Sequence, residues 1–126
     1  MSSEKTLIWV GSSKNDLIEF PEDVMDTMGY ALHLAQNGGK ASYAKPLKGL
    51  VPGNSIIEIV DNFDSDTYRA VYAVKFDDAI YVLHAFQKKS KKGIKTPKPD
   101  IDLIKSRLKD AESLSRRRIE NMRAKK

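Results

Sequence analysis

The stretch that decides the fold is YRAVYAVKFDDAIYVLHAF, residues 68–86. It contains two runs rich in β-branched and aromatic residues, at 68–76 and 79–86, which are typical of β-strands. The runs are separated by Asp77-Asp78, a pair that favours a tight turn. The stretch therefore predicts two neighbouring antiparallel strands joined by a two-residue hairpin.

The length of this turn decides which side chains share a face of the sheet. A two-residue turn pairs Phe76 with Ala79, and in that register Arg69 lies opposite Phe86 and one diagonal step from His84. Arg69 and His84 then emerge together on a mixed face that we expect to stay uncovered, while the other face is apolar enough to carry a helix. A loop of odd length would shift the pairing by one residue and separate the two side chains.

The apolar patterns on either side of the hairpin predict an α+β fold. Its elements follow in the order strand, two helices, three strands, helix. The predicted strands cover 6–10, 56–60, 68–76 and 79–86, and the predicted helices cover 14–20, 21 to the Asn37-Gly38-Gly39 stop, and 99 onward. A lysine-rich connection, 87–98, leads into the last helix. We expect residues 115–126 to form a basic extension that frays unless something covers it, because the apolar stripe of the helix fades there.

Composition narrows the possible functions. The chain has 126 residues, of which 40% are hydrophobic, enough for one domain spanning residues 1–126. It contains no cysteine and two histidines, which excludes disulfides, thiol nucleophiles and cysteine-ligated zinc. No apolar run reaches the length of a membrane span, and the first residues lack the features of a secretory signal. We therefore expect a cytoplasmic protein with no metal or other cofactor.

Charge is distributed unevenly along the chain, whose net charge is +5. Residues 1–78 contain seven Lys/Arg and twelve Asp/Glu, whereas residues 79–126 contain fifteen Lys/Arg and five Asp/Glu. A strongly basic second half favours a polyanionic partner such as nucleic acid, because each phosphate contact releases counterions. The alternative is a basic face that is merely solvated.

Five side chains on or near the mixed face could act on a phosphodiester. No phosphate-binding glycine loop, dinucleotide fingerprint or nucleophile elbow is present in the sequence. Arginine offers a bidentate clamp, lysine a point charge, and histidine or glutamate a proton acceptor. The candidates are Arg69, His84, Lys88, Lys89 and Glu58. The alternative is that Arg69 is a cross-strand ion-pair partner and His84 a hydrogen-bonded strand residue.

Three segments carry a resemblance to a known family. They are Tyr68-Arg69-Ala70-Val71-Tyr72, the segment YVLHAFQKKS at 81–90, and Lys95-Thr96-Pro97. Their combined spacing resembles the signature of the RelE/HigB toxin superfamily in its phage-derived branch, and the resemblance covers nearly the whole chain. It implies a RelE-like fold, in which a helical hairpin covers one face of a small, mainly antiparallel sheet and a helix ends the chain.

The resemblance also implies an activity and partners. Such proteins are the toxins of type II toxin–antitoxin systems, and many cleave messenger RNA in the ribosomal A site. The antitoxin in this branch is usually a helix-turn-helix, HigA-like protein. We therefore expect a metal-independent endoribonuclease that inhibits translation, with the ribosome, messenger RNA and a HigA-like antitoxin as its partners and no membrane.

The resemblance assigns roles to particular residues. Arg69 matches the arginine that stabilises the scissile phosphate, and Lys88 or Lys89 falls where a second basic catalytic residue lies. The family's basic residues on the strand before the hairpin are replaced by Glu58 and Val60, and its tyrosine near the chain end has no equivalent. The proton acceptor would then be Glu58 or the strand histidine. The residues expected to bind RNA are Lys45, Lys48, Lys91, Lys92 and Lys95.

Two other functions fit the same scaffold. A non-catalytic toxin or binding module, such as a ParE-like gyrase inhibitor, is favoured by the loss of the family's strand lysines. A small RNA-binding domain without toxicity is consistent with a basic surface alone. The nuclease hypothesis predicts that Arg69→Ala relieves growth inhibition and leaves a folded protein.

Overall fold

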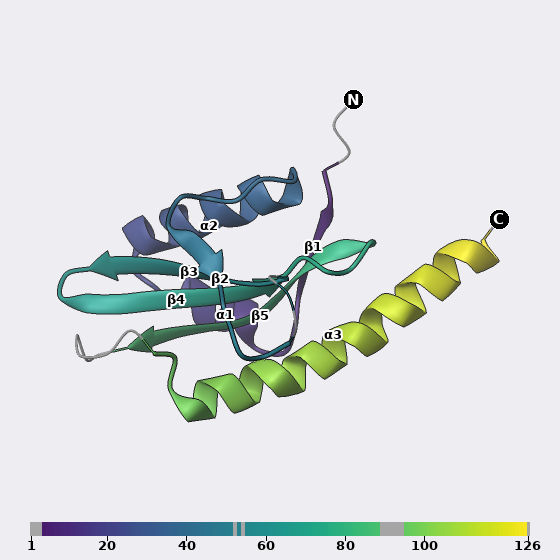
Figure 1. The fold of residues 1–126 in the computed structure, drawn as a ribbon. Coiled ribbons are helices and arrows are strands. Elements are labelled where there is room, and N and C mark those ends of the chain that lie inside the picture. The colour runs from purple at the N-terminus through teal and green to yellow at the C-terminus, as the bar shows by residue number, and fades with distance from the viewer. Residues whose placement is uncertain (1–3, 52, 54, 89–94, 126) are drawn as a thin grey trace.

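Eight helices and strands form within the residues that the computed structural model describes, 4–51, 53, 55–88 and 95–125. Their order confirms the predicted α+β fold, with one addition, a short strand in the loop before residue 56 (Figure 1). The elements are β1 (Thr6–Trp9), α1 (Ser13–Ile18), α2 (Glu22–Gln36), β2 (Ala44–Pro46), β3 (Ile56–Phe63), β4 (Asp66–Ala73), β5 (Ala79–Lys88) and α3 (Lys98–Ala124).

One five-stranded sheet in the order β1-β5-β4-β3-β2 runs through the middle of the molecule. β1 is parallel to β5, whereas the β2–β3, β3–β4 and β4–β5 pairs are antiparallel. The sheet is therefore mainly antiparallel, as the resemblance implies. Its two edges are its shortest strands, which limits the row of unpaired backbone groups that an edge exposes.

The helices α1 and α2 pack on one face of this sheet. α2 buries a residue at every third or fourth position, as its apolar period predicts, and these residues are Val24, Met28, Ala31, Leu32 and Ala35. The strand side chains in the same core are Ile57, Ile59, Tyr68, Ala70, Tyr72, Ile80, Val82 and Ala85. A helical hairpin on one face is therefore confirmed.

The terminal helix α3 covers the opposite face (Figure 1). This face carries Arg69 and His84, which are only 3% and 6% exposed. The expectation of an uncovered mixed face is therefore wrong. The apolar stripe of α3 needs an apolar surface, and the face that α2 leaves free supplies it. The buried contacts come from Ile104, Leu108 and Ala111 of the helix and from Val71, Ala73, Tyr81 and Leu83 of the strands.

The connection between β4 and β5 differs from the predicted two-residue hairpin. β4 ends at Ala73 and β5 begins at Ala79, which leaves a five-residue loop, and Ala73 pairs with Tyr81. An odd-length loop shifts the pairing by one residue, and on its own it would separate Arg69 from His84.

A β-bulge at Leu83 restores the register. Val71 pairs with His84, but the next residue of the strand, Tyr72, pairs with Val82. Leu83 is therefore left without a partner in the ladder, and the strand beyond it is advanced by one residue.

The bulge has two consequences for the face beneath α3. Arg69 pairs with Phe86, as predicted, so Arg69 and His84 lie on one face. The carbonyl oxygen of Leu83 accepts a hydrogen bond from Arg107 Nη1 of α3 at 3.0 Å. A backbone group that the ladder leaves unpaired thus helps to hold the helix on the sheet.

The helix α3 is continuous to Ala124, through the segment expected to fray unless something covers it. Asp78, in the loop before β5, anchors it where it leaves the sheet. The carboxylate of Asp78 accepts hydrogen bonds from the Tyr81 hydroxyl at 2.6 Å, from Arg118 Nε at 2.8 Å and from the Ser115 hydroxyl. Beyond this anchor the last turns of α3 project past the sheet (Figure 1).

Asp78→Ala is expected to lower the free energy of unfolding by about 2–3 kcal/mol at neutral pH, because three donors lose their acceptor. Burial raises the pKa of the Asp78 carboxyl, but the hydrogen bonds from Ser115, Tyr81 and Arg118 outweigh it, and the pKa is lowered. The stabilisation is therefore present above about pH 3.9, the ordinary value in an unfolded chain, and is lost as pH falls through the lower folded-state pKa. Urea unfolding at neutral pH and near pH 2.5 measures both effects.

Asp77→Ala is the matched control, because the Asp77 side chain on the same loop is exposed. Its free energy of unfolding should stay within about 0.5 kcal/mol of the wild type. The anchoring role would be contradicted if the two variants lost equal free energy of unfolding. It would also be contradicted if the difference in free energy of unfolding between the wild type and Asp78→Ala were as large near pH 2.5 as at neutral pH.

Candidate functional site

Side chains from four neighbouring strands form a row across the face beneath α3. Lys45 of β2 pairs with Glu58 of β3, Glu58 with Val71 of β4, and Val71 with His84 of β5. Arg69 lies two residues from Val71 on the same strand, so its side chain points to the same face. The prediction that Arg69 and His84 share a face is confirmed, and the ladder adds Glu58 and Lys45 to that face.

The centre of the row is a buried ion pair. Arg69 Nη1 lies 3.1 Å and 3.2 Å from the two carboxylate oxygens of Glu58, and the Thr96 hydroxyl donates to Glu58 Oε2 at 2.7 Å. Glu58 is 2% exposed and Arg69 3%. Arg69 Nε has no hydrogen-bond partner among the described residues. The positive charge of Arg69 is therefore neutralised inside the protein and is not presented at its surface.

His84 lies beside this pair but is bound to α3. Its Nε2 lies 2.7 Å from Asp100 Oδ1, and Arg107 Nη1 lies 3.5 Å from its Nδ1. Since a guanidinium group can only donate, this contact assigns the ring proton to Nε2, which donates to Asp100. The imidazole also stacks on Phe86, with 4.8 Å between ring centroids. Both ring nitrogens of His84 are thus engaged in holding the helix on the sheet.

A cavity of about 490 Å³ lies between β2 and the start of α3. Its lining includes Glu58 and Thr96 together with three exposed lysines, Lys45, Lys48 and Lys95. Three of the predicted RNA-binding lysines and one predicted catalytic carboxylate thus line the same cavity. His84 does not line this cavity. The remaining lining residues are Pro46, Leu47 and Ile101.

Of the other predicted lysines, the structure describes Lys88. Lys88 ends β5, and its Nζ donates to the carbonyl oxygen of Lys95 at 3.0 Å, which brings its ammonium group beside a residue of the cavity. Lys89, Lys91 and Lys92 lie outside the described residues.

Three side chains that organise this region were missed by sequence reasoning. They are Thr96, Asp100 and Arg107. Thr96 stands in one of the segments that carry the family resemblance, but its contact with Glu58 depends on how α3 docks. Asp100 and Arg107 are seven residues apart, which is two helical turns, so their shared side of α3 could have been found from spacing. The spacing could not show that this side of α3 contacts His84 of β5.

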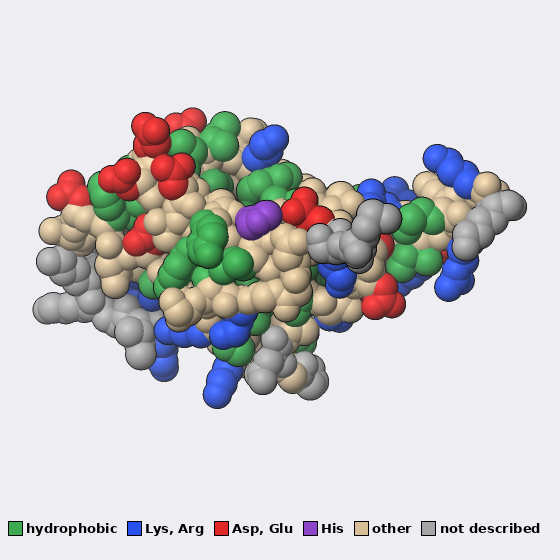
Figure 2. Space-filling model, turned by 90° about the horizontal axis from the view of Figure 1, so that it is seen from above, with side chains coloured by type: hydrophobic (Ala, Val, Ile, Leu, Met, Phe, Trp, Pro, Cys, Tyr) green, Lys and Arg blue, Asp and Glu red, His purple; other side chains and the backbone are tan. Residues whose placement is uncertain are grey.

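The surface charge follows the asymmetry of the sequence. Figure 2 shows acidic side chains gathered at one end of the molecule and lysine and arginine side chains on the projecting end of α3. Arg116 and Arg117 are exposed there, whereas Arg118 is held by Asp78. Within the described ranges, no group of three or more His, Cys, Asp or Glu residues could hold a metal ion. Nor does any helix in that part of the chain combine the length and apolar character needed to cross a membrane.

This arrangement can bind a phosphate and accept a proton at one place. Ammonium groups neutralise the charge that develops on a phosphate, and a carboxylate beside them can act as a base. The ion pair with Arg69 and the hydrogen bond from Thr96 fix the orientation of the Glu58 carboxylate. Arg69 therefore contacts the carboxylate, where the resemblance implied a direct contact with phosphate.

Comparison with known proteins gives a family. Among solved structures, the RelBE2 toxin–antitoxin complex from Mycobacterium tuberculosis resembles the chain with a TM-score of 0.46 at 14% identity, covering 71% of this chain and 98% of that one. No curated protein matches the chain. The family described as phage-derived protein Gp49-like matches residues 15–109, well over half of the 126 residues. The chain therefore belongs to the phage-derived Gp49-like family, the branch of RelE/HigB-type toxins that its sequence resembles.

Proposed function

We propose that the protein is a toxin that cleaves messenger RNA on the ribosome, with the lysine-lined cavity as its RNA site. The observation that carries this proposal is that Lys45, Lys48 and Lys95 line the same cavity as Glu58. Three ammonium groups at one cavity attract an RNA backbone through counterion release. A basic face that is only solvated gives no reason for three lysines to line one cavity together with a carboxylate.

The chemistry follows from the nucleophile that RNA itself carries. Glu58 accepts the proton of a 2′-hydroxyl, whose oxygen then bonds to the adjacent phosphorus. The bond from phosphorus to the 5′-oxygen breaks, and the leaving oxygen takes a proton from Lys88 or Lys95. The products are a 2′,3′-cyclic phosphate and a 5′-hydroxyl end. The remaining lysines stabilise the charge on the pentacoordinate phosphate.

In this mechanism Arg69 is a positioning residue. It contacts both carboxylate oxygens of Glu58, and unlike Glu58 it does not line the cavity. We assign no proton transfer to His84, because it does not line the cavity.

The partners that we propose are the ribosome, messenger RNA and a helix-turn-helix antitoxin of the HigA type. The support is the family to which the chain belongs and the motifs that it shares with RelE/HigB toxins. The strongly basic second half of the chain, which includes the exposed Arg116 and Arg117, would add attraction for ribosomal RNA.

A non-catalytic binding module is the second candidate function. It is favoured by the Glu58–Arg69 pair, because two buried charges that satisfy each other can serve the fold alone. Such a module would inhibit growth without cutting RNA, for example by binding DNA gyrase as ParE relatives do. Loss of supercoiling activity with intact messages would favour this candidate.

The test of the nuclease is primer extension on a defined message, with purified protein added to translating ribosomes or to naked RNA. The wild type should cut the message only with ribosomes present. The triple variant Lys45→Gln/Lys48→Gln/Lys95→Gln should cut at least about ten-fold more slowly at physiological salt, since three phosphate contacts are lost.

Lys14→Gln is the matched control, because Lys14 is an exposed lysine of α1 that does not line the cavity. It should cut at the wild-type rate. Equal cutting of naked RNA would contradict the ribosome dependence, and a triple variant as active as the wild type would contradict the cavity as the RNA site.

A further inference from the structure

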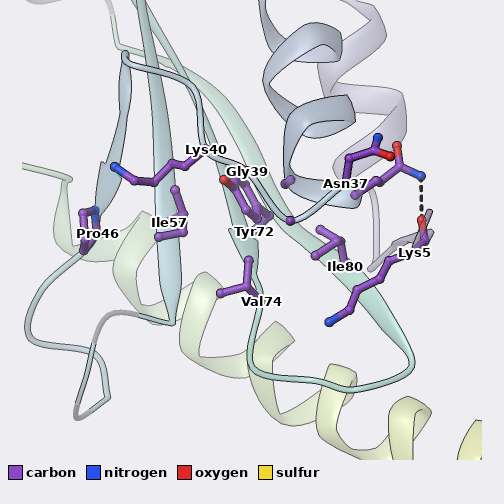
Figure 3. Close-up of a pocket in the computed structure, with 12 residues that line it drawn as sticks. Lys5, Asn37, Gly39, Lys40, Pro46, Ile57, Tyr72, Val74 and Ile80 are labelled. Carbon is purple, nitrogen blue, oxygen red and sulfur yellow. Dashed lines mark hydrogen bonds between the residues drawn. The ribbon is translucent and has the colours of Figure 1, made fainter. Parts of the chain in front are cut away.

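A second and larger cavity, of about 620 Å³, lies on the other face of the sheet, at the C-terminal end of α2. Figure 3 shows its floor, made by side chains of β3, β4 and β5 and the residues that follow β4. The apolar floor residues are Ile57, Tyr72, Val74 and Ile80, and the wall is the turn at 37–40. Cavities of this size and apolar character hold small molecules in many proteins.

The floor presents one tyrosine hydroxyl to the cavity. The Tyr72 residue is 1% exposed and its hydroxyl donates no hydrogen bond among the described residues, where Arg69 Nε is the buried polar side-chain atom without a partner. In Figure 3 the ring lies between Ile57 and Ile80, with its oxygen toward Gly39 and Lys40. Burial raises the pKa of Tyr72 to about 12, so the group remains a hydrogen-bond donor at neutral pH. An acceptor placed in the cavity would receive a hydrogen bond from this hydroxyl.

Two ammonium groups flank the floor, and Figure 3 shows them on opposite sides of the cavity. Lys5 Nζ donates to the carbonyl oxygen of Phe76 at 3.1 Å, and Lys40 Nζ to that of Ala44 at 3.0 Å. Each ammonium group therefore has protons left for another acceptor. Among the described residues, neither lysine forms an ion pair with a carboxylate.

Glu4, an acidic residue at this end of α2, is already engaged. The carboxylate of Glu4 accepts a hydrogen bond from Asn37 Nδ2 at 3.2 Å and lies 3.5 Å from His33 Nδ1. The start of β1 is also fixed to the end of α2, since Gln36 Nε2 donates to the Lys5 carbonyl oxygen at 2.8 Å. The cation at Lys5 is thus held at the cavity by the fold itself.

We propose that this cavity binds a small dicarboxylate with an apolar middle. The apolar part would lie on Ile57, Tyr72 and Ile80, one carboxylate would meet Lys40 and the Tyr72 hydroxyl, and the other would meet Lys5. Charge-assisted hydrogen bonds at both ends, with an apolar surface between them, select for this ligand class against neutral or cationic molecules. The inference does not rest on the proposed nuclease, because the two cavities lie on opposite faces of the sheet.

The test is calorimetric titration of the full chain with three probes of equal length, decanedioate, decanoate and 1,10-decanediol. The dicarboxylate should bind about ten-fold more tightly than the monocarboxylate, the value of one charge-assisted hydrogen bond, and the diol should bind weakest. The backbone amide resonances of Asn37, Gly38 and Gly39, which line the cavity, should shift on titration.

Variants locate the two ends of the ligand. Lys5→Gln should make decanedioate bind no better than decanoate, and Tyr72→Phe, which removes only the hydroxyl, should weaken both acids and spare the diol. Lys14→Gln, an exposed lysine outside the cavity, is the control and should change nothing.

Equal affinity for the diacid and the diol, amide shifts elsewhere in the chain, or no saturation at about 10 mM would overturn the proposal. Binding that required a peptide ending in a free carboxylate would assign the cavity to a protein partner and would overturn it as well. All of these outcomes leave the RNA-cleavage test unaffected.

Discussion

Glu58→Gln is expected to slow message cleavage by about 100-fold or more, the usual contribution of a general base. Glutamine keeps the shape of glutamate and can still accept hydrogen bonds from Thr96 and Arg69, but it cannot take up the proton of a 2′-hydroxyl. Because the lysines of the cavity are unchanged, binding to ribosomes should be kept. Primer extension in a translating system measures the first effect, and co-sedimentation with ribosomes the second.

Glu112→Gln is the matched control for this variant. Glu112 lies on α3 and pairs with Lys75 at 3.5 Å on the surface, so its replacement should leave cleavage within about two-fold of the wild type. Thermal unfolding establishes that each variant is folded. A folded Glu58→Gln protein that cuts at the wild-type rate would remove the proposed base and leave the binding module as the better hypothesis.

Arg69→Met is expected to lower the free energy of unfolding by about 3–5 kcal/mol, because it leaves the buried Glu58 charge without its partner. That is a large share of the stability of an ordinary domain, about 5–15 kcal/mol. The expectation that Arg69→Ala leaves a folded protein stays a prediction, and the buried ion pair with Glu58 weighs against it. It treated Arg69 as a surface clamp, whereas the side chain is buried beneath α3 and the segment that carries Thr96. Urea unfolding of the purified variant measures the loss.

The double variant Arg69→Met/Glu58→Met separates stability from activity. It replaces both charges with apolar side chains of similar length, and it should recover most of the lost stability. It should still fail to cleave RNA, since it has no base. Lys98→Met, which breaks the exposed pair with Asp102 at 2.9 Å, is the control and should cost about 0.5 kcal/mol or less. Wild-type stability in the Arg69→Met variant would refute the structural importance of the pair.

Most of the secondary structure could be predicted, because the periodic signals are long and unambiguous. The turn between β3 and β4 was the weakest point. β3 runs to Phe63, past the predicted end at residue 60, because Asp64 and Ser65 form a tight turn with φ angles of 50° and 74°. Such turns are usually marked by Asn-Gly or Asp-Gly, and Asp-Ser carries a much weaker signal.

The faces of the sheet were predicted in part. The sequence shows which residues alternate, but a bulge is set by tertiary contacts, here the Arg107 hydrogen bond to the freed carbonyl of Leu83. The side chains of β5 that precede the bulge consequently lie on the face of the sheet opposite to the predicted one. Tyr81, for example, packs beneath α3 and not beneath α2. Residues after the bulge, including His84, point as predicted.

The sequence predicted which residues belong to the candidate site, but not which residues they contact. The charge pattern and the family resemblance identified Glu58, Arg69 and the lysines. The sequence also shows that α3 is amphipathic, but an apolar stripe does not specify which surface it will cover. The burial of Arg69 and the capture of His84 by Asp100 both follow from that docking, and so they could not be foreseen.

The five-residue loop before β5 and the bulge at Leu83 behave as a compensating pair of length changes. Each moves the strand by one position, and only their combination keeps Arg69 and His84 in phase. In related chains, a residue gained or lost in this loop must therefore be matched by an opposite change inside β5. A gap in one segment alone would mark a family member whose arginine and histidine face away from each other.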